Sequence, residues 1–159
     1  MLTENSQINL FPDIYKNDLK RLEQEEDKNG SLLLIGRRQL RSNNSWLHNS
    51  YRMVKGRERC TMLIHPEDAA HHQIKSGEEV EVTSRVGQVK IKAEVSDEVG
   101  IGTVSIPHGW GHHREGIQMS VASNHAGVSM NDLVDEMLVD EMSGVAVING
   151  IPVSVKKII

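Results

Sequence analysis

The chain has 159 residues, of which 38% are hydrophobic and 25% charged, and its formal net charge is −4 at neutral pH. These values indicate one soluble globular domain with a short appendage, long enough to bury a hydrophobic core. They argue against a general nucleic-acid binder, which usually has a high pI, and against a membrane span, because no apolar run approaches about 18 residues.

The N-terminus and the cysteine content predict a cytoplasmic protein. The opening MLTENSQINLF lacks the basic and apolar regions of a secretory signal. Cys60 is the single cysteine, so an intramolecular disulfide is excluded and a reducing compartment fits. Because aromatic residues make up only 3% of the chain, the core must consist of Val, Ile, Leu, Met and Ala.

The first half of the chain predicts alternating helices and strands. A helix is expected over residues 12–30, with proline at its start and Asn-Gly at its end. The apolar run SLLLIG at 31–36 predicts a strand buried on both faces. CTMLIH at 60–65 predicts a second strand, and PEDAAHHQIKSG at 66–77 predicts a short helix that ends before its glycine.

Strand patterns dominate the second half. Apolar and polar residues alternate in 78–85 and in 89–95, and Gly87 between them marks a hairpin turn. Another strand is expected at 102–107, and Asn149-Gly150 between VAVI and IPVSV predicts a second hairpin. About seven short strands with two or three short helices favour a mainly β fold closed as a barrel, which removes exposed edges.

The polar loop GRRQLRSNNSWLHN at 36–49 is a candidate binding loop. Seven of the 18 basic residues lie between Arg37 and Arg59, against one acid, whereas residues 132–141 hold five acids and no base. Arginine suits phosphate oxygens, Asn and Ser suit the edge of a heterocycle, and Trp46 offers a face for stacking. The alternative is a solvated loop in which Asn and Ser make turns.

Two other segments carry candidate ligand contacts. In PHGWGHH at 107–113, the glycines around Trp110 let the backbone approach a ligand closely, whereas adjacent histidines without a nearby cysteine speak against a metal site. In SNHAGVSMNDLVDEM at 123–137, Asn124, Asn131 and Asp132 either contact a base or pterin edge or act as turn residues. In the second case, Asn131 or Asp132 is expected to cap a short helix through Met137. Cys60 is expected to act as a small hydrophobe.

Several of these segments, in this order, resemble the C-terminal dinucleotide-binding domain of molybdopterin-dependent oxidoreductases, above all the formate-dehydrogenase-like branch. The resemblance covers residues 8–159. The segments that carry it are LLLIGRRQLRSNNSWLHN, IHPEDAAHHQIKSGEEVEVTSRVGQV, PHGWGH, AGVSMNDLVDE and SGVAVINGIPVSV, with INLFPDIYKNDLKRL as a lead-in helix.

The resemblance implies a double-psi β-barrel over residues 31–159, preceded by an N-terminal extension with the lead-in helix over residues 1–30. It also implies that the barrel binds one molybdopterin guanine dinucleotide of a bis-dinucleotide molybdenum or tungsten centre. The residues expected to bind this cofactor are Arg38, Arg41, Ser42, Asn43, Asn44, Trp46, His48, His108, Gly109, Trp110, Asn131 and Asp132.

The family places its metal ligand, a Cys, selenocysteine or Ser, in an earlier domain, and Cys60 does not match that motif. No catalytic residue and no protein metal ligand is therefore expected here. The chain is expected to work with the remaining catalytic domains or a large subunit, with formate oxidation as the leading reaction, and not to turn over alone. The alternatives are a stand-alone cofactor-carrying module and a histidine-based metal-binding barrel.

Overall fold

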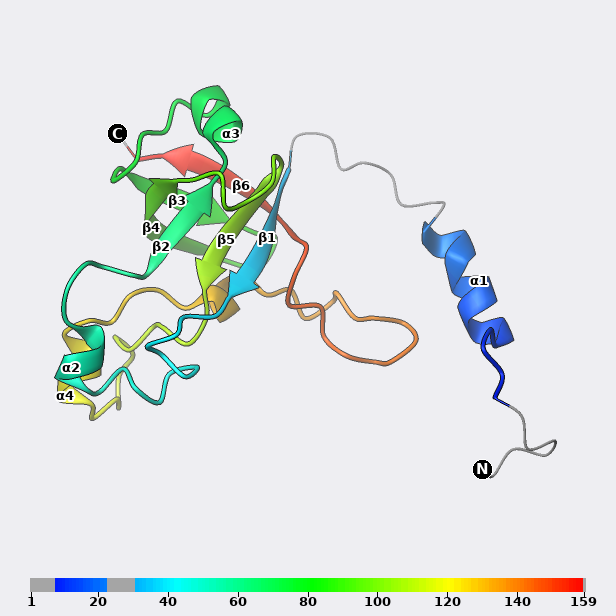
Figure 1. The fold of residues 1–159 in the computed structure, drawn as a ribbon, viewed down its shortest axis with the longest axis horizontal. Helices are drawn as coiled ribbons and strands as arrows, with labels where there is room; N and C mark the ends of the chain where they lie inside the picture. The colour runs from blue at the N-terminus through cyan, green and yellow to red at the C-terminus, as the bar shows by residue number, and fades with distance from the viewer. Residues whose placement is uncertain (1–7, 23–30, 159) are drawn as a thin grey trace.

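The computed structural model describes residues 8–22 and 31–158, and its main body is a β-barrel (Figure 1). Within these ranges, six strands close the barrel in the order β1-β5-β2-β4-β3-β6. The strands are β1 (Leu32–Arg37), β2 (Thr61–Ile64), β3 (Glu79–Thr83), β4 (Gln88–Val95), β5 (Thr103–Pro107) and β6 (Ile151–Lys157). The helices are α1 (Asp13–Leu22), α2 (Tyr51–Val54), α3 (Pro66–His71), α4 (Ser120–Ser123) and the 3₁₀ helix η1 (Met130–Leu133). The expected mainly β barrel with short helices is confirmed, with six described strands instead of seven.

The strand connections make this a double-psi β-barrel. Strand β1 pairs in parallel with β5, β2 pairs in parallel with β4, and β2 and β5 run antiparallel to each other. In the barrel, β5 lies between β1 and β2, while β2 lies between β5 and β4. The connection from β1 to β2 therefore crosses β5, and the connection from β4 to β5 crosses β2, so the two crossings interlock.

The core consists of aliphatic side chains that alternate along the strands. On β4, Val89, Ile91 and Ala93 are buried while the lysines between them are exposed, as the sequence pattern predicts. The prediction that the first strand is buried on both faces is wrong. Leu32 and Leu34 are buried, but Leu33 between them is 41% exposed, because alternate residues of a barrel strand face outward.

The prediction of a hairpin at Asn149-Gly150 is wrong as well. The Gly150 N–H donates to the Leu34 carbonyl, and the Asn149 Oδ1 accepts from the Gly36 N–H, both at 2.8 Å. These bonds hold the dipeptide against β1, so it leads into β6 instead of turning back on the preceding segment. The expected strand at 145–148 forms only an isolated bridge, Val139 to Ala146.

The helices are short, and α1 lies apart from the barrel (Figure 1). The expected first helix is confirmed from Asp13 to Leu22, with Tyr15 and Leu19 half exposed; its continuation at 23–30 falls outside the described residues. The expected domain boundary at residue 30 therefore stays a prediction. No helix within 8–22 and 31–158 is long and apolar enough to cross a bilayer.

Candidate functional site

Two loops leave the same end of the barrel because two strands run in parallel. Strands β1 and β5 are in register so that Arg37 pairs with Pro107, and the His108 N–H donates to the Arg37 carbonyl at 3.2 Å. The loop after β1 (residues 38–49) and the loop after β5 (residues 108–119) consequently emerge side by side, as Figure 1 shows. Most of the residues predicted to bind the cofactor lie on these two loops.

The loop at 38–49 is a series of tight turns joined to the neighbouring loop by one side chain. Asn43 and Asn44 have positive φ angles of 42° and 63°, a conformation that asparagine tolerates better than most residues. The Asn44 Oδ1 lies 2.8 Å from the Arg38 guanidinium and 2.9 Å from His108 Nε2. Arg38 and His108, from different loops, therefore share one acceptor.

A buried histidine pair fastens the two loops from inside. His48 Nδ1 lies 2.7 Å from His112 Nε2, and His48 Nε2 lies 2.8 Å from Ser42 Oγ. All three residues are buried. Burial, and then the neighbouring His112, lowers the pKa of His48 from 6.5 to about 4; burial also lowers the pKa of His112. Both rings are therefore neutral at pH 7, and both nitrogens of His48 have partners inside the protein.

Trp110 and Gly109 complete the contact between the loops. The Trp110 ring lies against His48 with a centroid distance of 4.0 Å and an angle of 31° between planes. Its indole N–H is buried and has no hydrogen-bond partner among the described residues. Gly109 has a φ of 88°, and a Cβ there would overlap the backbone carbonyl of Asn44. Only glycine fits this close approach without displacing the neighbouring loop.

The third predicted segment is positioned by ion pairs from other loops. Asn131 and Asp132 lie inside η1, whose N-cap is Ser129, so the prediction that one of them caps a helix reaching Met137 is wrong. The Asp132 carboxylate accepts a hydrogen bond from Arg114, which ties η1 to the loop after β5.

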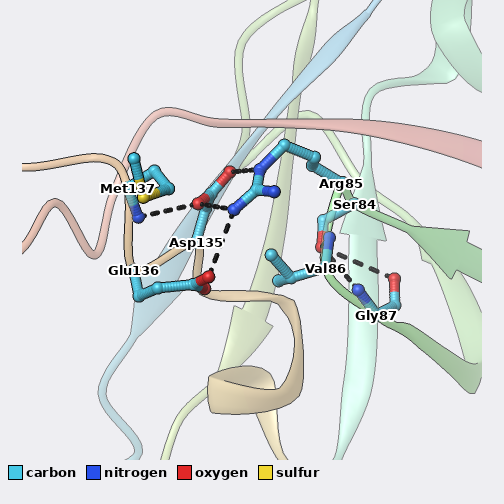
Figure 2. A network of polar contacts seen from close by, with 7 residues as sticks. All are labelled: Ser84, Arg85, Val86, Gly87, Asp135, Glu136 and Met137. Atoms are coloured by element: carbon cyan, nitrogen blue, oxygen red, sulfur yellow. Dashed lines mark hydrogen bonds and ion pairs between the residues drawn. The ribbon is translucent and has the colours of Figure 1, made fainter.

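A second ion pair holds the chain just after η1. Figure 2 shows Arg85, in the turn between β3 and β4, reaching across to the buried carboxylate of Asp135, which also accepts from the Met137 N–H at 2.8 Å. Hydrogen bonds from Arg85 lower the pKa of Asp135 to about 2, so this carboxylate is ionised at neutral pH. In the same turn, Gly87 lies so close to the Asp132 carbonyl that a Cβ would overlap it.

These loops surround a cavity of about 390 Å³, here called the loop cavity, which falls in the size range of small-molecule sites. Its lining consists of Gly36, Arg38, His108, Gly109, Met130, Asn131, Ile148 and Asn149. It thus combines a guanidinium, an imidazole and two amides with apolar side chains. Four of the twelve predicted residues line it: Arg38, His108, Gly109 and Asn131.

The other eight predicted residues do not line this cavity, and one of them, Trp110, packs against His48. The remaining seven form two groups. Ser42 and His48 are buried behind the loop, and Asn44 and Asp132 hold cavity-lining segments in place. The side chains of Arg41, Asn43 and Trp46 are exposed, with Trp46 83% exposed, and they do not line the cavity. The structure therefore gathers the predicted residues at one end of the barrel, but only a third of them line the loop cavity.

Sequence reasoning misses several residues of this site. The local pattern assigns Asn149 to a hairpin and Gly36 to the end of a strand, and it assigns no role to Met130 or Arg114. Asn149 beside a glycine carries the signal of a turn, but this signal does not mark its amide as part of a ligand site. Nothing in the sequence marks Arg114, because its partner Asp132 lies 18 residues away along the chain.

A second cavity of about 320 Å³, here called the α2 cavity, has Trp110 in its wall. It is lined by Val54, residues 56–60, Trp110 and residues 124–127, and it shares no residue with the loop cavity. Cys60 in its wall is 4% exposed, and burial raises the pKa of the thiol. Its Sγ accepts a hydrogen bond from the Val128 N–H at 3.3 Å, so Cys60 packs as the expected small hydrophobe.

The histidines of the chain do not form a metal centre within the described part of the chain. No group of three or more His, Cys, Asp or Glu side chains converges there in a way that could hold a metal ion. The rings of His48 and His112 are hydrogen-bonded to each other. The ring of His71, the last residue of α3, contacts the ring of His72, the residue after it.

Comparison with known proteins adds three findings. Residues 32–152 match the family model described as "Molydopterin dinucleotide binding domain". A tetrathionate reductase polypeptide of Salmonella typhimurium strain LT2 is 26% identical over 114 residues, which cover 61% of this chain and 11% of that protein. The structure of acetylene hydratase from Pelobacter acetylenicus superimposes with a TM-score of 0.67 at 22% identity, covering 96% of this chain and 21% of that chain.

The chain is thus much shorter than the proteins it resembles. It spans about a tenth of the tetrathionate reductase polypeptide and about a fifth of acetylene hydratase. The match to the family model covers the barrel from β1 to the start of β6.

Proposed function

Because the chain belongs to the molydopterin dinucleotide binding domain family, we propose that its barrel binds one molybdopterin guanine dinucleotide of a bis-dinucleotide molybdenum or tungsten centre. In this proposal the chain is the terminal domain, or a small subunit, of a larger oxidoreductase of the formate-dehydrogenase-like branch. The observation that carries the proposal is the loop cavity, where residues from four separated segments of the chain converge.

The donors of the loop cavity fit such a ligand chemically. The Arg38 guanidinium suits a phosphate, because its planar array of N–H groups matches phosphate oxygens. The amides of Asn131 and Asn149 can donate to and accept from the edge of a heterocycle, and Met130 and Ile148 supply apolar surface for its ring. When bound, the dinucleotide centre supplies two-electron redox chemistry at its metal; the residues of this chain bind and orient it.

The remaining predicted residues take different parts in this proposal. Ser42 and His48 support the loop instead of contacting the cofactor, because both nitrogens of His48 already have partners in the protein. Asn44 and Asp132 hold Arg38 and η1 in place. The exposed Arg41, Asn43 and Trp46 reach portions of the cofactor that extend beyond the loop cavity, and Trp110 supports the loop by packing against His48.

The remainder of the catalytic machinery belongs to other parts of the enzyme. The chain spans only about a tenth and a fifth of the two relatives, which supports a separate catalytic body that supplies the protein ligand of the metal. The chain by itself should not turn over, because it completes a cofactor site that the rest of the enzyme shares, and formate oxidation is the reaction we propose for the whole enzyme. Its cytoplasmic location stays a prediction.

The proposal is tested by replacing Arg38 with Ala in the protein purified from its own host with whatever polypeptide accompanies it. A charge-assisted hydrogen bond contributes about 1.5–3 kcal/mol, so dinucleotide retention should fall roughly ten- to a hundredfold. Molybdenum or tungsten is measured by elemental analysis, and the pterin by the fluorescence of its oxidised derivative.

The matched control is Arg52→Ala, an exposed arginine of α2 that lines neither cavity. Retention should be unaffected in this variant. Equal pterin and metal content in the Arg38 variant and the unsubstituted protein would overturn the assignment of the loop cavity. Recovery of the loaded chain without any companion polypeptide would instead favour the stand-alone carrier.

A further inference from the structure

Asn149 lines the loop cavity with a side chain whose orientation the protein itself sets. Its Oδ1 lies 2.8 Å from the Gly36 N–H, and because a backbone N–H can only donate, the amide atom that faces Gly36 must be the oxygen. The backbone that follows is fixed as well, since the Gly150 N–H donates to the Leu34 carbonyl at 2.8 Å. The Asn149 amide is therefore oriented before any ligand binds.

This orientation leaves the Nδ2 group of Asn149 as a donor without a partner in the protein. Asn149 is exposed, and no residue within 8–22 and 31–158 forms a hydrogen bond with its Nδ2. An amide nitrogen donates and does not accept. Whatever pairs with Nδ2 must therefore bring an acceptor atom.

The surroundings of this donor suit a flat ring with an oxygen on its edge. Met130 and Ile148 line the same cavity, and the Met130 thioether packs over Gly36, where an added Cβ would lie 3.1 Å from its Sδ. Within the described part of the chain, no Asp or Glu lines this cavity, so no carboxylate competes for the amide. A neutral donor beside apolar side chains matches the oxo group of a heterocycle.

A charged donor for phosphate stands elsewhere in the same cavity. The exposed Arg38 gives one N–H to Asn44 Oδ1, and its other guanidinium N–H groups have no partner among the described residues. The loop cavity thus separates a guanidinium, which suits phosphate oxygens, from a neutral amide donor.

We propose that Asn149 is a specificity-determining residue of the loop cavity, whose Nδ2 donates to the oxo oxygen of a 2-amino-4-oxopyrimidine ring, an edge that guanine and pterin share. This inference rests on the proposed function and deepens it, because it assigns opposite tasks to the two ends of one amide: Oδ1 binds Gly36 and Nδ2 binds the ligand. Since Gly36 already orients the side chain, little freedom is lost when the ring binds.

Asn149→Asp separates the two ends of the amide. The aspartate keeps an oxygen for the Gly36 N–H and removes the Nδ2 donor with almost no change in shape. In the protein purified from its own host with any accompanying polypeptide, dinucleotide retention should fall about tenfold, measured as pterin and metal content after gel filtration. Retention equal to that of the unsubstituted protein would overturn the proposal, because Asn149 would then serve Gly36 alone.

The matched control is Asn49→Asp. Asn49 is also exposed, and its Oδ1 accepts from the Val121 and Ala122 N–H groups at 3.1 and 3.2 Å, so the aspartate again keeps the bonds to the backbone. Asn49 lines neither cavity. Retention should be unchanged in this variant, and an equal loss in both variants would contradict a specific role of Asn149.

Asn149→Ala removes the donor without adding a charge. A loss of about five- to tenfold, similar to that of Asn149→Asp, is expected for a neutral oxo partner. If the aspartate variant loses retention and the alanine variant does not, the new charge causes the loss and the donor role is wrong. If the aspartate variant loses about a hundredfold more than the alanine variant, the partner is an anionic phosphate and the oxo assignment is wrong.

An NMR titration then identifies which ring supplies the oxo group. The side-chain N–H₂ signals of Asn149 in the ¹⁵N-labelled chain are those that disappear in Asn149→Asp. With the retention loss established, a saturable shift of these signals on addition of GMP assigns the guanine as the partner. Signals that GMP leaves unchanged assign the pterin.

Arg38→Ala, measured in parallel, separates failure of this inference from failure of the proposed function. If Arg38→Ala loses the cofactor and Asn149→Asp keeps it, the loop cavity binds the dinucleotide but the role of Asn149 is wrong. If both variants keep the cofactor, the loop cavity is not the dinucleotide site and both proposals are wrong. Loss in both variants supports both.

Discussion

His48 is held on three sides by groups that leave no ring nitrogen exposed: Ser42, His112 and the face of Trp110. In the folded protein it stays neutral down to about pH 4, whereas in the unfolded chain it takes up a proton near pH 6.5. Between these values the unfolded state binds more protons, so acid favours unfolding. The stabilising contribution is complete above about pH 6.5 and is lost as the pH falls toward 4.

This difference predicts the pH dependence of stability. The free energy of unfolding should fall by about 2 kcal/mol between pH 7.5 and pH 5, and His112, with its pKa lowered in the same direction, should add to the loss. Urea unfolding at several pH values measures the change. His48→Asn should flatten the dependence, and His113→Gln, at the exposed neighbouring position, should preserve it. A flat profile in the unsubstituted chain would refute the buried neutral pair.

Gly109 is the second residue on which the loop arrangement depends. Gly109→Ala combines a positive φ angle with an overlap against the Asn44 carbonyl, so it should destabilise the chain by about 2–4 kcal/mol. Gly116→Ala is the matched control: its φ of 86° is similar, but nothing lies within 4 Å of the added methyl group, so the cost should be about 1–2 kcal/mol. Thermal unfolding measures both, and equal losses would show that the loop contact is unimportant.

At the level of elements, the turn between β3 and β4 acts as a clamp on the segment after η1. Arg85 contacts Asp135 and Glu136, and Asp135 is the buried member of this group (Figure 2). Because Asn131 lies only four residues before Asp135, its position in the loop cavity depends on this clamp.

Asp135→Asn should loosen this segment while leaving the barrel intact. The amide is neutral and offers Arg85 one acceptor oxygen in place of two, so the ion pair is lost, and hydrogen exchange should quicken over residues 131–137 and stay slow in β1 to β6. Glu136→Gln, whose side chain is 74% exposed and 3.4 Å from Arg85, should leave exchange unchanged. Exchange that quickens equally in the strands would mean that Asp135 supports the whole fold instead.

Local patterns in the sequence predict the elements that depend on local chemistry. The alternation of Val89, Ile91 and Ala93 predicts β4, and Gly87 predicts its turn. Asn149-Gly150 is equally turn-like, yet its backbone bonds to Leu34, 116 residues away, and no local pattern contains that partner. Pair contacts across the fold, such as His48 with His112, likewise have no local signature, which is why the predicted site residues divide into lining and supporting groups.

At the level of the whole molecule, closure of the barrel brings the loops of the site together. The parallel pairing of β1 with β5 sets two of the four segments that line the loop cavity side by side, and β6 places Asn149 beside Gly36. The order of the segments is recognisable in the sequence through its resemblance to the family, whereas the cavity exists only once all six strands are paired.

Strand β6 pairs with both β1 and β3, which are otherwise not neighbours, and it is the last of the six strands in the chain (Figure 1). During synthesis on the ribosome, the edges of β1 and β3 that pair with β6 therefore stay unpaired until Ile151–Lys157 has emerged from the exit tunnel. Assembly of the loop cavity is thus a late event for the nascent polypeptide, and a cofactor can be received only after translation has passed this strand.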